Sequence, residues 1–265
     1  MLGRLKRVCK LLTGRAASKP PPRAHPAKQQ AAPAAGKPKS ALAIQKELLS
    51  GRDVRTIFDV GANTGQSVAQ YRAAFAQAAI YSFEPFPGSF EILRRKCEVD
   101  ALCKCFQLAV SSKSGHAKLH ANKDAATNSL FPTTKEVGIW VDADEIREVD
   151  AITVPVTTID EFCEQQSVSG IDILKMDIQG GELLALQGAG GMLQRGAITM
   201  IFLEALFVPI YENQALFHEI CEFLFRRGYT LFDLYNSVHA PNGQLKWCDA
   251  LFLGPELGSA KCKAT

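Results

Sequence analysis

A turn rich in glycine carries the clearest chemical signal in this sequence. It follows the apolar stretch 57–60 and contains Gly61, Asn63 and Gly65. Glycine lacks a Cβ and tolerates positive φ, so a ligand can come close to the backbone there, and asparagine also tolerates the left-handed region. A second apolar stretch, 79–83, ends at Glu84. Because an acidic residue about twenty positions after such a turn holds ribose hydroxyls in nucleotide-binding folds, these features predict an adenosine-like ligand at the ends of adjacent parallel strands.

The spacing of the glycines distinguishes the possible ligands. A dinucleotide-binding turn needs the pattern G-x-G-x-x-G, and Gln66 occupies the place of its last glycine. Asp59 precedes the turn, and its carboxylate would repel a pyrophosphate but attract a cationic ligand. S-adenosylmethionine, with its sulfonium and ammonium groups, therefore fits better than NAD. A tight turn without a ligand and an NAD-dependent oxidoreductase are the alternatives.

Charge is distributed unevenly along the 265 residues. The net charge is +3, but residues 1–40 contain ten Lys or Arg and no acid, which leaves 20 basic and 27 acidic residues in the remainder. A basic globule for nucleic-acid binding is therefore not indicated. No apolar run approaches the roughly 18 residues that a membrane span needs.

The eight cysteines are scattered rather than arranged in a disulfide or metal pattern. Cys97, Cys103 and Cys105 lack the C-x-x-C spacing of a zinc site. The sequence favours reduced, packed thiols and a cytoplasmic, reducing location.

Three parts are expected along the chain. Residues 1–39 are basic and rich in Pro and Ala, which predicts a disordered tail, with a short amphipathic stretch near its start that could contact an anionic membrane surface weakly. Residues 40–254 form the folded domain, which begins with a helix capped by Ser40. Residues 255–265 are expected to be a flexible tail.

The domain alternates between strand and helix patterns from residue 55 onward. The expected strands are 57–60, 79–83, 105–110, 171–177, 198–204, 229–234 and 247–253, and residues 122–150 are expected to be irregular. No helix-length segment separates the last two strands, so they should be antiparallel neighbours. This pattern predicts an α/β fold with a doubly wound, mostly parallel sheet whose last strand is antiparallel.

Six short motifs in order resemble the FkbM family of S-adenosylmethionine-dependent methyltransferases. They are Asp59–Gly65, Phe83–Pro85, Ala109–Ser111, Asn128–Leu130, Val156–Asp160 and Leu174–Glu182. The resemblance covers about residues 56–253. It implies a Rossmann-like seven-stranded domain of methyltransferase class I and methyl transfer, most often to a hydroxyl of a sugar or another small natural product.

The expected cofactor site follows from the strand order together with the resemblance. The turn should cradle the methionine part, Glu84 should bind the ribose, and residues at the end of the third strand should border the adenine. The residues assigned to the cofactor are Asp59, Gly61, Asn63, Thr64, Gly65, Glu84, Pro85, Ala109 and Val110.

The catalytic assignment depends on the need to remove a proton from a hydroxyl acceptor. The candidates are Asp177 at the end of the fourth core strand, Glu182, Glu204 and His239 in the last connection. Lys175, two residues before Asp177 on the same face of the strand, is assigned to the catalytic site with them. A purely structural Lys175–Asp177 ion pair is the alternative for those two residues.

Gln179 stands where the family's K-x-D-x-E-G-x-E motif usually has its first glutamate. An amide cannot accept a proton as a carboxylate does. A methyltransferase fold that binds the cofactor but has weakened catalysis is therefore the alternative function. Asp177, Glu182 and Glu204 could together suit magnesium, but with Gln179 in the motif no metal site is assigned. The acceptor pocket is expected from residues 122–150 and from the segment after Glu204.

Overall fold

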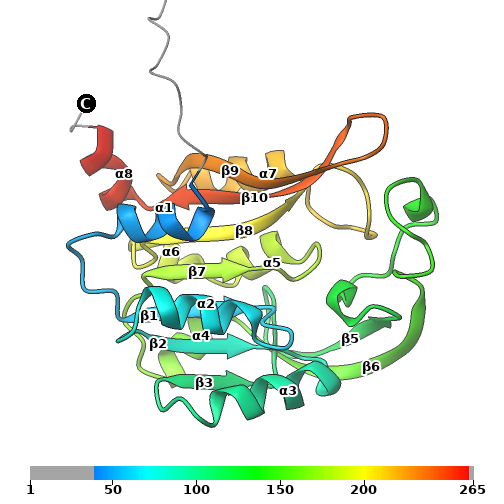
Figure 1. The fold of residues 1–265 in the computed structure, drawn as a ribbon, viewed down its shortest axis with the longest axis horizontal. Coiled ribbons are helices and arrows are strands. Elements are labelled where there is room, and N and C mark those ends of the chain that lie inside the picture. The colour runs from blue at the N-terminus through cyan, green and yellow to red at the C-terminus, as the bar shows by residue number, and fades with distance from the viewer. Residues whose placement is uncertain (1–38, 263–265) are drawn as a thin grey trace, which may run out of the picture. The chain divides into compact units, whose positions relative to one another are not determined.

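The computed structural model describes residues 39–262 (Figure 1). The predicted N-terminal tail, apart from Lys39, lies outside the described residues. None of the helices in the described part is long and apolar enough to span a bilayer. The central feature of residues 39–262 is a seven-stranded sheet, and it confirms the predicted fold class.

The strand order of this sheet is β3-β2-β1-β7-β8-β10-β9. All neighbours pair in parallel except β10, which runs antiparallel to both β8 and β9. The predicted reversal of the final strand is therefore confirmed. The strands are β1 Thr56–Val60, β2 Ala79–Phe83, β3 Cys103–Phe106, β7 Ile173–Met176, β8 Met200–Leu206, β9 Thr230–His239 and β10 Leu245–Leu253.

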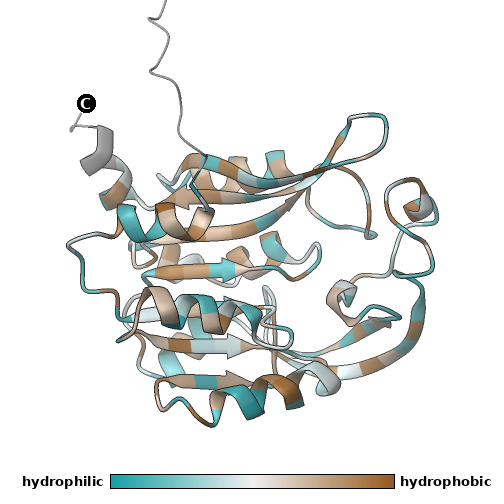
Figure 2. Cartoon of the chain, in the orientation of Figure 1, coloured by the Kyte–Doolittle hydropathy of each residue, from teal (hydrophilic) through white to brown (hydrophobic). Residues whose placement is uncertain are grey.

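Helices cover both faces of the sheet, which explains why its central strands are mostly apolar. One face packs against α1 (Ala41–Leu48), α2 (Gln66–Ala74), α3 (Pro87–Cys97) and α8 (Pro255–Cys262). The other face packs against α4 (Ile159–Gln165), α5 (Glu182–Gln187), α6 (Gly190–Gln194) and α7 (Phe217–Phe225). In Figure 2 the strands are accordingly mostly apolar, and the helices carry both hydrophobic and hydrophilic residues.

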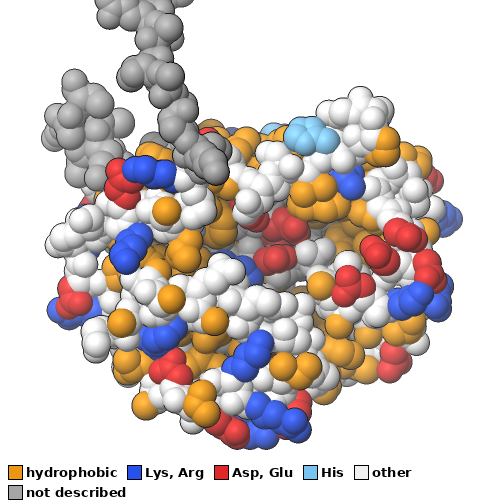
Figure 3. All heavy atoms as spheres, in the orientation of Figure 1, with side chains coloured by type: hydrophobic (Ala, Val, Ile, Leu, Met, Phe, Trp, Pro, Cys, Tyr) orange, Lys and Arg blue, Asp and Glu red, His pale blue; other side chains and the backbone are white. Residues whose placement is uncertain are grey.

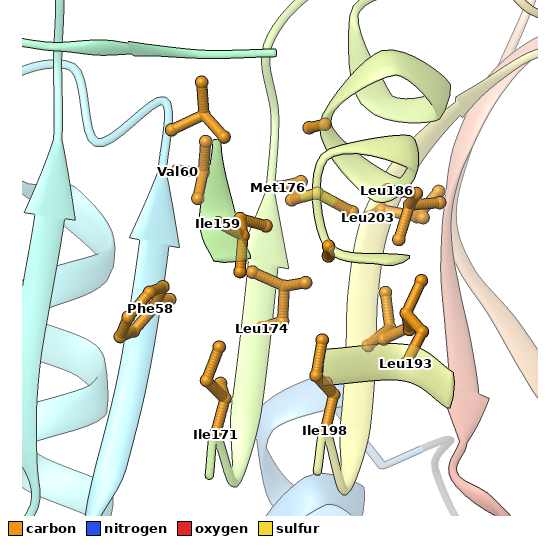
Figure 4. Close-up of a cluster of buried hydrophobic side chains, with 14 of the residues drawn as sticks. Phe58, Val60, Ile159, Ile171, Leu174, Met176, Leu186, Leu193, Ile198 and Leu203 are labelled. Carbon is orange, nitrogen blue, oxygen red and sulfur yellow. The ribbon is translucent and has the colours of Figure 1, made fainter. Parts of the chain in front are cut away.

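The core between β1, β7, β8 and their helices fixes the sheet edge that carries the motifs. Figure 4 shows Phe58, Leu174 and Leu203 of the strands facing Ile159 and Leu193 of the helices. These side chains are at most 1% exposed. Burying side chains of this size stabilises the fold by about 1.5–3 kcal/mol each.

Side-chain caps mark the starts of two helices, and the cap at Ser40 lies where the sequence predicts it. The Ser40 hydroxyl accepts a hydrogen bond from the Ala43 amide at 3.3 Å at the start of α1, and the Thr158 hydroxyl accepts one from the Glu161 amide at 3.0 Å at the start of α4. Such caps satisfy amides that have no partner within the helix.

The predicted third strand, 105–110, is divided between two sheets. β3 ends at Phe106, and β4 (Ala109–Val110) pairs instead with β6 (Glu148–Thr157). With β5 (Gly115–Asn122), these form a second sheet of order β4-β6-β5 beyond the carboxyl ends of β1–β3 (Figure 1). The run is apolar except for Gln107, so the pattern does not reveal the change of partner. The region predicted as irregular is correspondingly shorter, because β5 and β6 extend into it.

Two other expectations are wrong. Residues 255–262 form α8 rather than a flexible tail, and Leu257 is buried against the sheet. Cys97 and Cys103 are joined as a disulfide, because the end of α3 and the start of β3 bring their Cα atoms to 5.2 Å. The four cysteines found free in the described part are Cys105, Cys163, Cys221 and Cys248. The disulfide removes one of the arguments for a reducing compartment.

Candidate functional site

A cavity of about 440 Å³ lies at the carboxyl ends of β1, β2 and β7. Figure 3 shows the molecule hollowed at the centre of this face, with acidic side chains gathered in the hollow. The segment between β5 and β6 contributes a further wall. The lining residues that matter for the chemistry are Gly61, Asn63, Glu84, Pro85, Ala109, Val110, Asn128, Ser129, Lys175, Asp177, Gln179, Asn236 and Asp249.

The glycine turn forms one wall through its backbone. Gly61 has a φ of +76°, and a Cβ there would come within 1.8 Å of the Asp177 carbonyl oxygen. The amides of Gly61 and Ala62 both donate to the Phe83 carbonyl oxygen, at 3.0 and 2.9 Å. Asn63 has a φ of 47°. The turn therefore needs glycine at position 61 both for conformation and for space.

Thr64 and Gly65 do not line the cavity. Gly65 has a φ of +81° at the start of α2, and a Cβ there would lie 3.0 Å from Leu93 of α3. Its absent side chain thus serves helix packing. Of the turn residues assigned to the cofactor, the structure brings Gly61 and Asn63 to the cavity.

Glu84 is held at the cavity by the turn itself. Its two carboxyl oxygens accept hydrogen bonds from the Asn63 amide at 2.9 Å and the Phe86 amide at 2.8 Å. Burial raises the pKa of Glu84 to about 7, and the two amide hydrogen bonds oppose that rise. Each oxygen keeps a second lone pair, so the side chain can accept hydrogen bonds from a diol.

Asp59 lies behind the turn and is fully buried. The Lys175 ammonium is 3.0 Å from Asp59 Oδ1 and donates a hydrogen bond to the Gly61 carbonyl oxygen at 3.0 Å. The approach to Asp59 is an ion pair without hydrogen-bond geometry, so both Asp59 oxygens lack a hydrogen bond within the described part. Burial alone would lower the pKa of Lys175, but Asp59 and Asp177 outweigh it and the pKa is raised. Lys175 therefore pairs with Asp59 and ties β7 to the turn.

The opposite wall is a network of side chains. Gln179 Nε2 donates to Asp177 Oδ1 and to Glu204 Oε2, both at 2.8 Å. The Tyr211 hydroxyl lies 2.7 Å from Gln179 Oε1. Asn236 Nδ2 donates to Asp249 Oδ2 at 2.6 Å on the neighbouring strands. Two carboxylates that line the cavity, those of Asp177 and Asp249, are thus each held by a side-chain amide.

Two of the predicted catalytic residues lie elsewhere. Glu182 is 2% exposed and does not line the cavity; its oxygens accept from the Ile178 amide at 2.8 Å and the Gly180 amide at 3.1 Å. Burial raises its pKa to about 7. His239 is exposed at the end of β9, outside the cavity, because β9 continues through the stretch that the sequence suggested as a loop. The structure brings Asp177 and Lys175 to the cavity and leaves Glu182 and His239 out.

Asn236 and Asp249 line the cavity but were not among the predicted site residues. Asp249 is the one acid of the mostly apolar strand β10 and lies directly opposite Glu204 on β8. A lone acid within such a strand is the signal that could have identified it. In residues 39–262, no group of three His, Cys, Asp or Glu is arranged to hold a metal ion.

The sequence of this domain matches a family model described as the methyltransferase FkbM domain over residues 59–231. The chain belongs to the FkbM methyltransferase family. It is therefore a methyltransferase, and its methyl donor is S-adenosylmethionine.

Two relatives and one solved structure show which proteins the chain is similar to. The chain is 24% identical over 194 residues to 2-O-methyltransferase NoeI of Sinorhizobium fredii, covering 71% of this chain and 79% of that protein. It is 26% identical over 153 residues to methyltransferase sdnD of Sordaria araneosa, covering 50% of this chain and 59% of that protein. Among solved structures, the precorrin-6y C5,15-methyltransferase of Geobacter metallireducens is similar, with a TM-score of 0.43, 12% identity and coverage of 80% of this chain and 86% of that one.

The cavity fits this cofactor. The turn lines the cavity at Gly61 and Asn63, and Glu84 presents two acceptor oxygens to a ribose. Leu108, Ala109 and Val110 supply an apolar surface for a base. Bound there, S-adenosylmethionine supplies an activated methyl group on a sulfonium. The residues of the chain supply orientation, exclusion of water and a place for the acceptor's proton.

Proposed function

We propose that this methyltransferase acts on a hydroxyl of a saccharide or another small polyhydroxylated acceptor, with Asp177 as proton acceptor. One observation carries the proposal. Asp177 lines the cavity, and its Oδ1 is held by Gln179 while its Oδ2 forms no hydrogen bond with any described residue. A carboxylate oxygen of this kind can receive the proton of a hydroxyl placed within about 3 Å of it.

The reaction balances without another reactant. The hydroxyl oxygen bonds to the methyl carbon, the bond between that carbon and sulfur breaks, and its electron pair stays on S-adenosylhomocysteine. The hydroxyl proton passes to Asp177. A general base of this type contributes about 10²–10⁴-fold to the rate.

The rest of the lining suits a neutral, hydroxylated acceptor. Amide and hydroxyl side chains occupy it at Gln66, Ser67, Gln70, Asn128 and Asn236. Lys175 is the one cationic side chain that lines the cavity within the described part, and it is engaged by Asp59. A phosphorylated acceptor would therefore find no free cation there. The name of the relative from Sinorhizobium fredii, a 2-O-methyltransferase, agrees with transfer to oxygen.

Release of S-adenosylhomocysteine with a panel of neutral, anionic and amino sugars tests the proposal. We expect turnover with at least one hydroxylated acceptor and a loss of about 10²–10⁴-fold in Asp177→Asn, with unchanged affinity for S-adenosylmethionine. Asp150→Asn, an exposed residue of β6, is the matched control. Full activity of Asp177→Asn, or methylation of amines alone, would contradict the proposal.

A further inference from the structure

A neutral amide sits between two carboxylates at the wall of the cavity. Gln179 Nε2 has two hydrogens, and each has its own acceptor: Asp177 Oδ1 and Glu204 Oε2, both at 2.8 Å. Asp177 follows β7 and Glu204 lies on β8, so the amide links the ends of two neighbouring strands. A primary amide is the smallest neutral side-chain group that can donate to two acceptors from one nitrogen.

A buried hydroxyl lies beside the oxygen of the amide. Tyr211 is 2% exposed, and its hydroxyl lies 2.7 Å from Gln179 Oε1 and 3.0 Å from the Thr127 carbonyl oxygen. Burial, and then the nearby carboxylates, raise the pKa of Tyr211, so the hydroxyl stays protonated and can donate. A reversed amide would turn Oε1 toward two carboxylate oxygens. The two carboxylates therefore select the orientation with Nε2 toward them, and in it the hydroxyl can donate its one hydrogen to Oε1.

The backbone of Gln179 is also constrained. Its φ is 54°, in the left-handed region, and its carbonyl oxygen accepts a hydrogen bond from the Ser129 hydroxyl at 2.7 Å. Ser129 and Thr127 belong to the segment between β5 and β6 that lines the cavity. Gln179 is thus connected through its backbone to the segment between β5 and β6 and through its side chain to the two carboxylates.

The charges around the two carboxylates are few and identifiable. Burial raises the pKa of Glu204 well above its ordinary value, and Asp177, Glu182 and Asp249 raise it further while Lys175 opposes them. A third carboxylate at position 179 would add to this repulsion.

We infer that Gln179 is a positioning residue for methyl transfer, which holds Asp177 with its free oxygen toward the cavity and keeps Glu204 beside it, and that Tyr211 supports the amide through its oxygen. The inference rests on the proposed role of Asp177. In this arrangement the departure from a glutamate at position 179 does not remove the proton acceptor. It supplies the two N–H donors that orient it.

Carbon-13 NMR of the carboxyl groups tests the inference without any acceptor. The full chain is labelled at the carboxyl carbons of Asp and Glu, and the signals of Asp177 and Glu204 are assigned through Asp177→Asn and Glu204→Gln. In Gln179→Met and in the isosteric Gln179→Glu, we expect the titration of Glu204 to move upward by about one pH unit or more, and the Asp177 signal to shift. Tyr211→Phe should produce a smaller change in the same direction.

Tyr229→Phe is the matched control, because the Tyr229 hydroxyl is also buried but donates to the Ile198 carbonyl oxygen at 2.8 Å away from the cavity. It should leave both signals unchanged. With an acceptor from the panel, Gln179→Met should lower kcat while KM for S-adenosylmethionine stays the same. Unchanged signals in both Gln179 variants would overturn the inference even if sugar methylation is confirmed, whereas an inactive panel would leave the NMR result standing.

Discussion

The two walls of the cavity are built by different means. The wall at β1 and β2 consists of backbone: the turn at Gly61 is held by the Phe83 carbonyl oxygen, and Glu84 is held by the amides of Asn63 and Phe86. The wall at β7 and β8 consists of side chains from distant parts of the sequence, which hold one another through Gln179.

This difference separates the two tasks of the site. A backbone wall presents a constant shape to a cofactor whose structure does not vary. A side-chain wall can be changed residue by residue without moving the backbone of the turn. Lys175 connects the walls, since it contacts Asp59 and Gly61 of the first from a strand of the second.

The largest expected effect comes from cutting this connection. Lys175→Met leaves Asp59 buried without a counter-ion, and breaking a buried pair in this way costs about 3–5 kcal/mol. Urea unfolding measures the loss. Lys123→Met, at an exposed ion pair with Asp144, should change the unfolding free energy by about 0.5 kcal/mol or less. Equal effects of the two substitutions would show that the walls are not joined through Lys175.

Gly61→Ala tests the backbone wall. The new Cβ would lie 1.8 Å from the Asp177 carbonyl oxygen, in addition to the strained φ of +76°. We expect a loss of about 3 kcal/mol and no binding of S-adenosylmethionine by calorimetry. Gly243→Ala isolates the strain, because its φ is +87° and nothing lies within 4 Å of the added carbon; it should cost about 1 kcal/mol. Retained binding in Gly61→Ala would contradict the close approach of cofactor and turn.

The protonation of Glu84 gives a smaller effect. Its pKa is raised from 4.5 to about 7 by burial, and the ionised form is the better partner for ribose hydroxyls and a cationic donor. The affinity for S-adenosylmethionine should therefore be about tenfold lower at pH 6 than at pH 8. Calorimetry at the two pH values measures this difference.

Variants separate this titration from others in the site. Glu84→Gln should bind weakly and without this pH dependence, whereas Glu182→Gln should retain it, because Glu182 does not line the cavity. The stability of the fold depends on pH in the opposite direction to the binding affinity. Because the pKa of Glu84 is raised in the folded protein, its contribution to stability is present below about pH 4.5 and is lost as the pH rises through about 7. A pH-independent affinity of the wild-type protein would argue against Glu84 as the ribose ligand.

An effect of similar size is expected on the stability of the side-chain wall. Ser129→Ala removes the hydrogen bond to the Gln179 carbonyl oxygen and the one from the Phe131 amide, which should cost about 1–2 kcal/mol. Thermal unfolding measures it. Ser50→Ala, at an exposed residue of the turn after α1, should cost about 0.5 kcal/mol or less. An equal response would mean that the segment between β5 and β6 is not fixed through Gln179.

The same contrast explains what could be predicted from the sequence. The turn and Glu84 form a local pattern of residue types at fixed spacing, so both their place in the sheet and their position at the cavity could be predicted. Tyr211 acts through contacts with residues far away in the sequence, and no local spacing identifies those contacts. Asp249 stands out as the one acid of β10, but this signal does not reveal its partner Asn236. His239 was misplaced because the length of β9 is set by pairing with β10 and not by its own apolar pattern.

The second sheet carries one wall of the cavity separately from the central sheet. After β3 the chain leaves the central sheet, forms β4, β5 and β6, and returns to the central sheet through α4. The loop 123–147 therefore connects two strands of the second sheet, whereas the glycine turn follows a strand of the central sheet. Insertions or exchanges in that loop can therefore change one wall of the cavity while the turn at Gly61 keeps its place at the end of β1.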